Sequence, residues 1–135
     1  MSSSPSISHS IDTARRLLYL RIHREPSIPE AEESLLAAFQ DPLYAAGFNC
    51  LVDRTCVGPP TTRYVHGLTD IIHRHRDIFT PARVAVVVSN PATYGMFRML
   101  QALTYDVPCE SNIFMSEAEA EKWLCRPETE PLEIV

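Results

Sequence analysis

Three histidines near the middle of the chain are the first residues whose types suggest chemistry. His73 and His75 are separated by one residue, and His66 lies a little upstream. A zinc site needs three or four such ligands around one point. On a helix, however, His73 and His75 point about 200° apart, and His66 and His73 share a face two turns apart. This spacing favours a solvated helix face, and we expect no metal site and no cofactor.

The cysteines offer a nucleophile without a recognisable catalytic arrangement. Cys50, Cys56, Cys109 and Cys125 form no C-x-x-C pair, so neither a zinc ribbon nor a thioredoxin-type redox site is indicated. The chain also lacks the G-x-S-x-G, Walker and G-x-G-x-x-G motifs. We therefore predict a protein that is not an enzyme. The alternative is a hydrolase or redox enzyme that uses Cys56, which falls in an expected loop.

The segment 89–95, Ser-Asn-Pro-Ala-Thr-Tyr-Gly, is a candidate binding corner. It follows an expected central strand at 84–88, and open α/β sheets bind ligands beyond the carboxyl ends of their parallel strands. Free N–H groups at the start of the next helix could hold an anion or a carbonyl oxygen. Asn90 or Thr93 would equally serve as an ordinary helix cap, with Tyr94 packing nearby, and we favour the cap. Gly95, within a helix, suggests a close approach to the backbone.

The helix after this corner carries an apolar stripe and one aromatic residue beside it. Met96, Met99, Leu100 and Leu103 repeat at helical spacing, so this stripe is expected to face the sheet. Phe97 lies about 100° away from Met96. We expect its ring beneath a neighbouring helix, in a homodimer contact or against a ligand. A rim or ligand position would make Phe97→Ala much less costly than the roughly 3–5 kcal/mol of a core aromatic.

The hydrophobic pattern predicts a single α/β domain, whose elements would position these groups. The expected strands lie at 6–11, 15–24, 48–53, 84–88 and 111–115. The expected helices run from a Ser27–Glu30 capping box to Asp41, from about Thr62 to Phe79, from about Thr93 to Tyr105, and from a Ser116–Glu119 capping box to about Leu124. Right-handed crossovers then predict a mixed, mostly parallel sheet with an antiparallel opening hairpin, in the order (β)βαβαβαβα. The domain should span 6–126, with flexible termini at 1–5 and 127–135.

Composition excludes several classes of function. The chain has 135 residues, of which 45% are apolar and 21% charged, as in ordinary soluble domains. No apolar run approaches the roughly 20 residues of a membrane-spanning helix, and the Ser-rich start does not resemble a signal peptide. The formal charge of −5 argues against nucleic-acid binding. We expect a cytoplasmic protein.

Several segments together resemble a known family. These are Ala-Val-Val-Val-Ser at 85–89, Tyr-Gly-Met-Phe-Arg-Met at 94–99, Phe-Met-Ser-Glu-Ala-Glu-Ala-Glu-Lys-Trp-Leu at 114–124, and Leu-Val-Asp at 51–53. They resemble the SpoIIAA-like group of the STAS-domain family over about residues 15–125. The resemblance implies a mixed sheet with helices mainly on one side, no enzymatic activity, and a regulatory binding role. Some members also resemble CRAL-TRIO lipid-carrier domains, which implies an apolar ligand or a membrane-facing role.

One part of the family pattern is absent. Sporulation-type members are switched by phosphorylation of a serine in a D-S-S-G-like loop. The corresponding loop at 53–62 contains no serine, and its hydroxyl side chains are Thr55, Thr61 and Thr62. We expect a phosphate at Thr61 or Thr62 to be tolerated at the helix N-terminus but not used.

The sequence therefore predicts a non-enzymatic regulatory or ligand-binding module. Its occupant is expected to be a partner protein or a small apolar, lipid-like molecule, and nucleic acid is not expected. The predicted binding edge lies at the carboxyl ends of the strands and comprises Asp53, Thr55, Asn90, Tyr94 and Phe97. A purely structural homodimer is a further alternative, as is peripheral contact with a membrane without a membrane span.

Overall fold

In the computed structural model, which describes residues 5–126, five strands form one sheet in the order β1-β2-β3-β4-β5. The strands are β1 (Ile7–Asp12), β2 (Leu17–Ile22), β3 (Asn49–Asp53), β4 (Arg83–Val87) and β5 (Glu110–Phe114). β1 is antiparallel to β2, and all other neighbours are parallel. The predicted order and the mixed, mostly parallel sheet are confirmed. The predicted termini at 1–5 and 127–135, apart from Pro5, lie outside the described residues.

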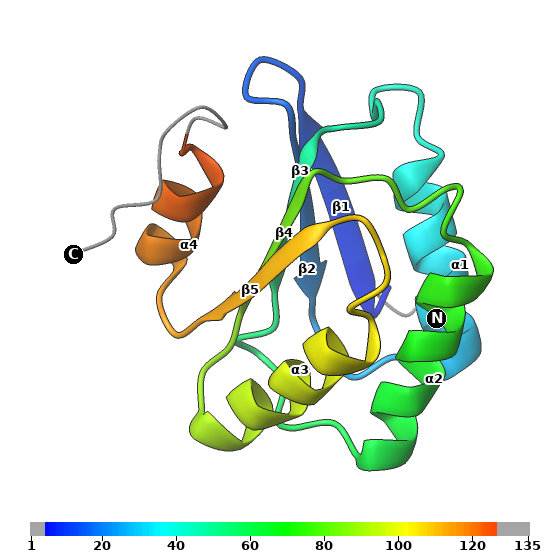
Figure 1. Ribbon diagram of the computed structural model, residues 1–135, viewed down its shortest axis with the longest axis vertical. Helices are drawn as coiled ribbons and strands as arrows, with labels where there is room; N and C mark the ends of the chain where they lie inside the picture. The colour runs from blue at the N-terminus through cyan, green and yellow to red at the C-terminus, as the bar shows by residue number, and fades with distance from the viewer. Residues whose placement is uncertain (1–4, 127–135) are drawn as a thin grey trace.

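Three of the four helices cover one face of the sheet. The helices are α1 (Ile28–Phe39), α2 (Thr62–Arg74), α3 (Pro91–Leu103) and α4 (Glu117–Leu124). α1, α2 and α3 each connect one parallel strand to the next, and right-handed crossovers in a constant direction place them on the same face. α4 follows the last strand and packs on the opposite face, against β3, β4 and β5 (Figure 1).

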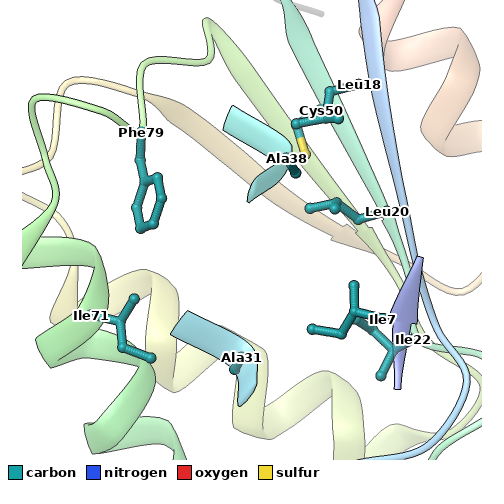
Figure 2. Packing of buried hydrophobic residues seen from close by; sticks show 9 residues of the cluster. All are labelled: Ile7, Leu18, Leu20, Ile22, Ala31, Ala38, Cys50, Ile71 and Phe79. Carbon is teal, nitrogen blue, oxygen red and sulfur yellow. The ribbon is translucent and has the colours of Figure 1, made fainter. Parts of the chain in front are cut away.

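Alternation along the strands gives each face its own apolar core. Leu18 and Leu20 of β2 point toward α1 and α2, together with Cys50 of β3, and Figure 2 shows them opposite Ile71 of α2. Leu51, the residue after Cys50, points the other way and packs with α4. Because successive side chains on a strand alternate between faces, the same two strands contribute to both cores.

Side-chain caps fix where the helices begin. Ser27 and Glu30 form the predicted capping box at α1, with each side chain binding the other residue's backbone N–H. At α4 the Ser116 side chain accepts from the N–H of Glu119, which is one half of the predicted box. Asn90 caps α3. These caps satisfy N–H groups that have no partner within the helix.

Helix α2 ends earlier than the sequence predicted. His75 is its C-cap, and the N–H groups of Ile78 and Phe79 both donate to the His75 carbonyl oxygen. The chain therefore leaves the helix in turns, which direct Phe79 into the core against Phe39. Helical periodicity predicted burial of Phe79 correctly but extended the helix too far, because a turn can bury the same residue.

The expected inward stripe of α3 is wrong. The buried residues of this helix are Thr93 and Phe97, whereas Met96 and Met99 are only half-buried. α3 lies against α2 and over β5, so its buried face is centred between these two neighbours rather than on the most apolar spacing. Phe97 is thus a member of the core, packed with Val86 and Ile113.

Candidate binding site

A cavity of about 200 Å³ lies between the sheet and helices α1, α2 and α3. Side chains from the strands form one wall, and side chains from the helices form the other. Most of the lining atoms are hydrocarbon. Central members of the lining are Leu20, Val52 and Val86 from the sheet and Leu35, Leu68 and Phe97 from the helices.

Short side chains help to explain why space remains between these layers. Ala31 of α1 lines the helical wall, while Cys50 and Val84 line the sheet wall. The helices themselves approach closely at Gly67 of α2, where a Cβ atom would lie 2.6 Å from Cδ1 of Ile28. α1 and α2 therefore pack tightly against each other while the layer between them and the sheet is less completely filled.

Arg54 is the charged residue in the cavity lining, and it is almost fully buried, at 3% exposure. Its position follows from the strand, because Asp53 faces the α4 side and the next residue turns to the cavity side. Nη2 donates to Oε2 of Glu25 at 2.6 Å and to the carbonyl oxygen of Gly58 at 3.1 Å. Nη1 lies 3.4 Å from Oε1 of Glu25. The guanidinium carbon lies 4.9 Å from the ring centroid of Phe97, within the range of a cation–π contact.

The Nε–H group of Arg54 makes no hydrogen bond within the described residues, unlike the donors on Nη2. Within residues 5–126, Nε is the one buried side-chain nitrogen or oxygen atom without a hydrogen-bond partner. A buried donor left in this state costs free energy, and native proteins contain few of them. This donor is covered by the protein around it, so Arg54 is held in place by its Nη1 and Nη2 contacts alone.

Three of the remaining polar side chains of the lining bind the protein itself. Nε2 of Gln101 donates to the Ser111 carbonyl oxygen at 2.6 Å, and Oγ1 of Thr104 donates to the Leu100 carbonyl oxygen at 2.8 Å. Oδ1 of Asn112 accepts from a backbone N–H at 2.9 Å.

The tyrosine and the two cysteines of the lining are held in their neutral forms. Burial raises the pKa of the Tyr64 hydroxyl to about 12. Burial also raises the pKa of the Cys50 and Cys109 thiols. Because the thiolate is the nucleophilic form of cysteine, neither thiol is activated.

The structure separates the five residues of the predicted binding edge. Phe97 lines the cavity, whereas the other four lie outside its lining. Oδ1 of Asp53 accepts from the N–H of Thr55 at 2.9 Å and from its Oγ1 at 2.7 Å. Oδ1 of Asn90 accepts from the N–H of Thr93 at 2.8 Å. Tyr94 packs beside the core around Phe97. A binding role for these residues stays a prediction.

The electrostatics of Asp53 are those of a structural carboxylate. Burial raises its pKa, but the hydrogen bonds from Thr55 and the nearby Arg21 guanidinium, at 3.4 Å, outweigh this effect. The net pKa is lowered, so Asp53 is charged at neutral pH. Its carboxylate already pairs with Arg21 and accepts two hydrogen bonds from Thr55.

His73, His75 and Cys56 are dispersed. His73 pairs with Asp106, which follows α3, at 3.0 Å, whereas His75 pairs with Glu32 of α1 at 2.6 Å. No group of three or more His, Cys, Asp or Glu residues within 5–126 is arranged to hold a metal ion. Cys56 is exposed in the loop after β3.

Sequence reasoning missed Arg54, the residue that distinguishes the cavity. It stands between two residues that were named, Asp53 and Thr55. An arginine directly after a buried strand was a weak signal, since the position one step beyond the strand's last outward residue should face the other layer. Nothing in the periodicity indicated that this layer would enclose it.

Comparison with known proteins shows the fold class. No protein-family model matches the chain, and neither does any curated protein. Five strands in sequential order with one antiparallel edge, three helices on one face and a last helix on the other, form a SpoIIAA-like fold. This confirms the fold that the sequence resemblance implied.

The solved structure that carries this comparison is an uncharacterized protein of the DUF3478 family from Shewanella loihica PV-4, described as having a SpoIIAA-like fold. It superposes with a TM-score of 0.61 and 19% sequence identity, over 93% of this chain and 99% of that one. No helix within residues 5–126 has the length and apolar character needed to cross a membrane.

Proposed function

We propose that this protein is a non-enzymatic binding module that holds a small apolar molecule between its sheet and helices α1, α2 and α3. The observation that carries the proposal is the cavity of about 200 Å³ with its hydrocarbon lining. An engineered apolar cavity of about 150 Å³ is known to bind benzene. The space here can accept a ligand somewhat larger than benzene.

An unfilled space of this size costs free energy of folding, and a bound ligand would reduce that cost. Protein interiors are packed about as densely as organic crystals, with few voids larger than a water molecule. Lining side chains lose dispersion contacts wherever no partner atom faces them. A ligand that fills the cavity restores these contacts, and removal of its own apolar surface from water adds to the affinity.

The test is a titration of the purified protein with isopropylbenzene, followed by two-dimensional amide NMR and by thermal unfolding. We expect chemical-shift changes at cavity residues such as Val52 and Val86. We also expect the midpoint of unfolding to rise with ligand concentration, because a ligand that binds only the folded state stabilises it.

A matched pair of variants on α1 sharpens this test. Ala31→Leu places three additional carbon atoms into the cavity lining, whereas Ala37→Leu makes the same change on the exposed side of the helix. Ala31→Leu should weaken isopropylbenzene binding at least about tenfold, and Ala37→Leu should leave it unchanged. Equal affinities in both variants, or shift changes confined to the surface, would refute binding in the cavity.

A further inference from the structure

The cavity is elongated, and its shape bears on the class of ligand, an inference that rests on the proposed function. All five strands contribute to the lining, with Ile7 from β1, Leu20 from β2, Val52 from β3, Val86 from β4 and Ile113 from β5. Neighbouring strands lie about 4.8 Å apart, so about 19 Å separates β1 from β5. A compact space of about 200 Å³ would touch only two or three neighbouring strands. The space is therefore extended across the sheet.

One end of the cavity lies over β1 and β2 and is apolar. Ile7 and Ile22 are paired across these two strands, and Figure 2 shows them side by side. Ala31 of α1 lines the cavity with them and belongs to the same buried cluster. The exposed fractions of Ile7, Ile22 and Ala31 are 8%, 5% and 1%. This end is therefore shielded from water and suited to a hydrocarbon group.

The opposite end lies over β5, against which α3 packs. Gln101 of α3, Thr104 directly after this helix and Ser111 of β5 line the cavity there. All three residues are polar and half-buried. None of the described lining residues from α3, from β5 or from the loop between them is charged. An uncharged polar group can lie here next to water, whereas a charged group would lose hydration without meeting an ionic partner in the lining.

The volume sets the amount of hydrocarbon that this extended space can hold. Because a cavity of about 150 Å³ holds the six carbon atoms of benzene, about 200 Å³ corresponds to about eight carbon atoms. A compact ligand of that size would leave the two ends of the space empty. The side chains at those ends would then lack partner atoms, so a ligand that fills the cavity has its carbon atoms in a row.

We propose that the ligand has one unbranched alkyl chain of about eight carbon atoms and an uncharged polar head. The chain crosses the sheet from β5 to β1, and its methyl end lies between Ile7, Ile22 and Ala31. The head lies at the polar end over β5, where it exchanges hydrogen bonds with the half-buried side chains or with water.

Two eight-carbon alcohols of different shape test this assignment. n-Octanol has an unbranched chain and cyclooctanol a compact ring, and each is titrated into the wild type. We expect n-octanol to bind at least about tenfold more tightly. In its complex, intermolecular NOEs should connect the terminal methyl group with Ile7 and Ile22, and the methylene group next to the hydroxyl with Thr104 and Ser111. Both sets of NOEs in one complex would show that the chain spans the cavity in the proposed direction.

A series of n-alcohols from hexanol to dodecanol measures the length of the space. Affinity should rise about fourfold for each added methylene group while the chain still enters the cavity. The rise should stop near a chain of about eight carbon atoms. In Ala31→Leu, which narrows the apolar end, it should stop at a shorter chain, whereas Ala37→Leu on the exposed side of α1 should leave this length unchanged. Octanoate, which has the same chain with a charged head, should bind more weakly than n-octanol.

The outcomes separate this inference from the proposed function. Equal affinities for n-octanol and cyclooctanol, or NOEs from the whole chain to one end of the cavity, would leave the cavity function intact and overturn the unbranched ligand. NOEs in the reverse direction, or tighter binding of octanoate than of n-octanol, would overturn the placement of an uncharged head over β5. Failure of isopropylbenzene and of every alcohol to bind would overturn the proposed function itself. Should Ala31→Leu not fold, the NOEs in the wild type decide the matter.

Discussion

The two faces of the sheet are built from the same strands but are covered in different ways. On one face, three helices form a layer that leaves a cavity of about 200 Å³ above the strands. On the other, the single helix α4 places Ala120 and Leu124 against Leu51, Ala85 and Val87, all of them buried. Small residues on both sides of this second contact let the helix lie close to the strands. The difference teaches that alternation along the same strands can support close packing on one face and leave a cavity on the other.

The polar groups differ between the faces as well. Beside α4, side chains bind the helix directly. Nδ2 of Asn49 donates to the Leu124 carbonyl oxygen at 2.9 Å, Arg83 donates to the Trp123 carbonyl oxygen at 3.2 Å, and the Tyr19 hydroxyl donates to Glu117 at 2.7 Å. The first two bonds satisfy carbonyl groups at the C-terminal end of α4, and the third binds a side chain of its first turn. On the cavity face, Arg54 keeps a donor without a partner.

The largest difference should appear when the same leucine truncation is made on each face. Leu51→Ala removes a fully buried side chain from the α4 face and should lower the free energy of unfolding by about 4 kcal/mol. Leu20 is also buried, at 2% exposure, but it lines the cavity, and Leu20→Ala should cost about 2–3 kcal/mol because fewer atoms contact the side chain where it borders the cavity. Urea unfolding measures both values. Equal costs would show that the cavity is filled or collapsed in solution.

The reverse substitution, from alanine to leucine, should lower the stability of the protein to different extents on the two faces. Ala120→Leu on α4 adds volume to a packed contact and should destabilise the protein by about 1–3 kcal/mol. Ala31→Leu on α1 adds the same volume next to the cavity and should change stability by less than about 1 kcal/mol. Thermal unfolding compares the two. A larger loss for Ala31→Leu than for Ala120→Leu would contradict the contrast between the faces.

The smallest expected effect concerns pH and the α4 face. Because the pKa of Asp53 is lowered in the folded protein, its charge stabilises the fold above the ordinary aspartate pKa of about 3.9, and this contribution is lost as pH falls through the folded value. Asp53→Asn can still accept from Thr55 but loses the pairing with Arg21. It should cost less than about 1 kcal/mol at pH 7. The difference from wild type should shrink toward zero near pH 2, and a difference that grows with acid would disprove this role.

Much of the fold could be predicted from the sequence, because local signals and topology agreed. The Ser27–Glu30 capping box, the strand alternation around Leu18 and Leu20, and the rule of right-handed crossovers sufficed for the element order. The inward face of α3 could not be predicted, since its neighbours α2 and β5 decide which side is covered. Met96 and Phe97 are adjacent apolar residues, and apolar character alone does not rank them.

The candidate site could be predicted only in part. Phe97 was named for its odd position and does line the cavity, although as a member of the core. Arg54 was not named, because its burial depends on Glu25, a residue 29 positions earlier in the chain. Cavities arise from mismatches of volume between layers, and such mismatches are not visible in the period of one element.

The sequential strand order has a consequence for how the molecule forms. Each strand pairs only with strands adjacent to it in the chain, so the sheet and α1, α2 and α3 assemble through short loop closures, which cost little entropy and favour rapid folding. The α4 face is different, since the contact from Tyr19 to Glu117 closes a separation of 98 residues. We therefore expect the cavity between the sheet and helices α1, α2 and α3 to form before α4 docks on the opposite face. Amide hydrogen exchange during refolding would then show protection in β2 and β3 ahead of α4.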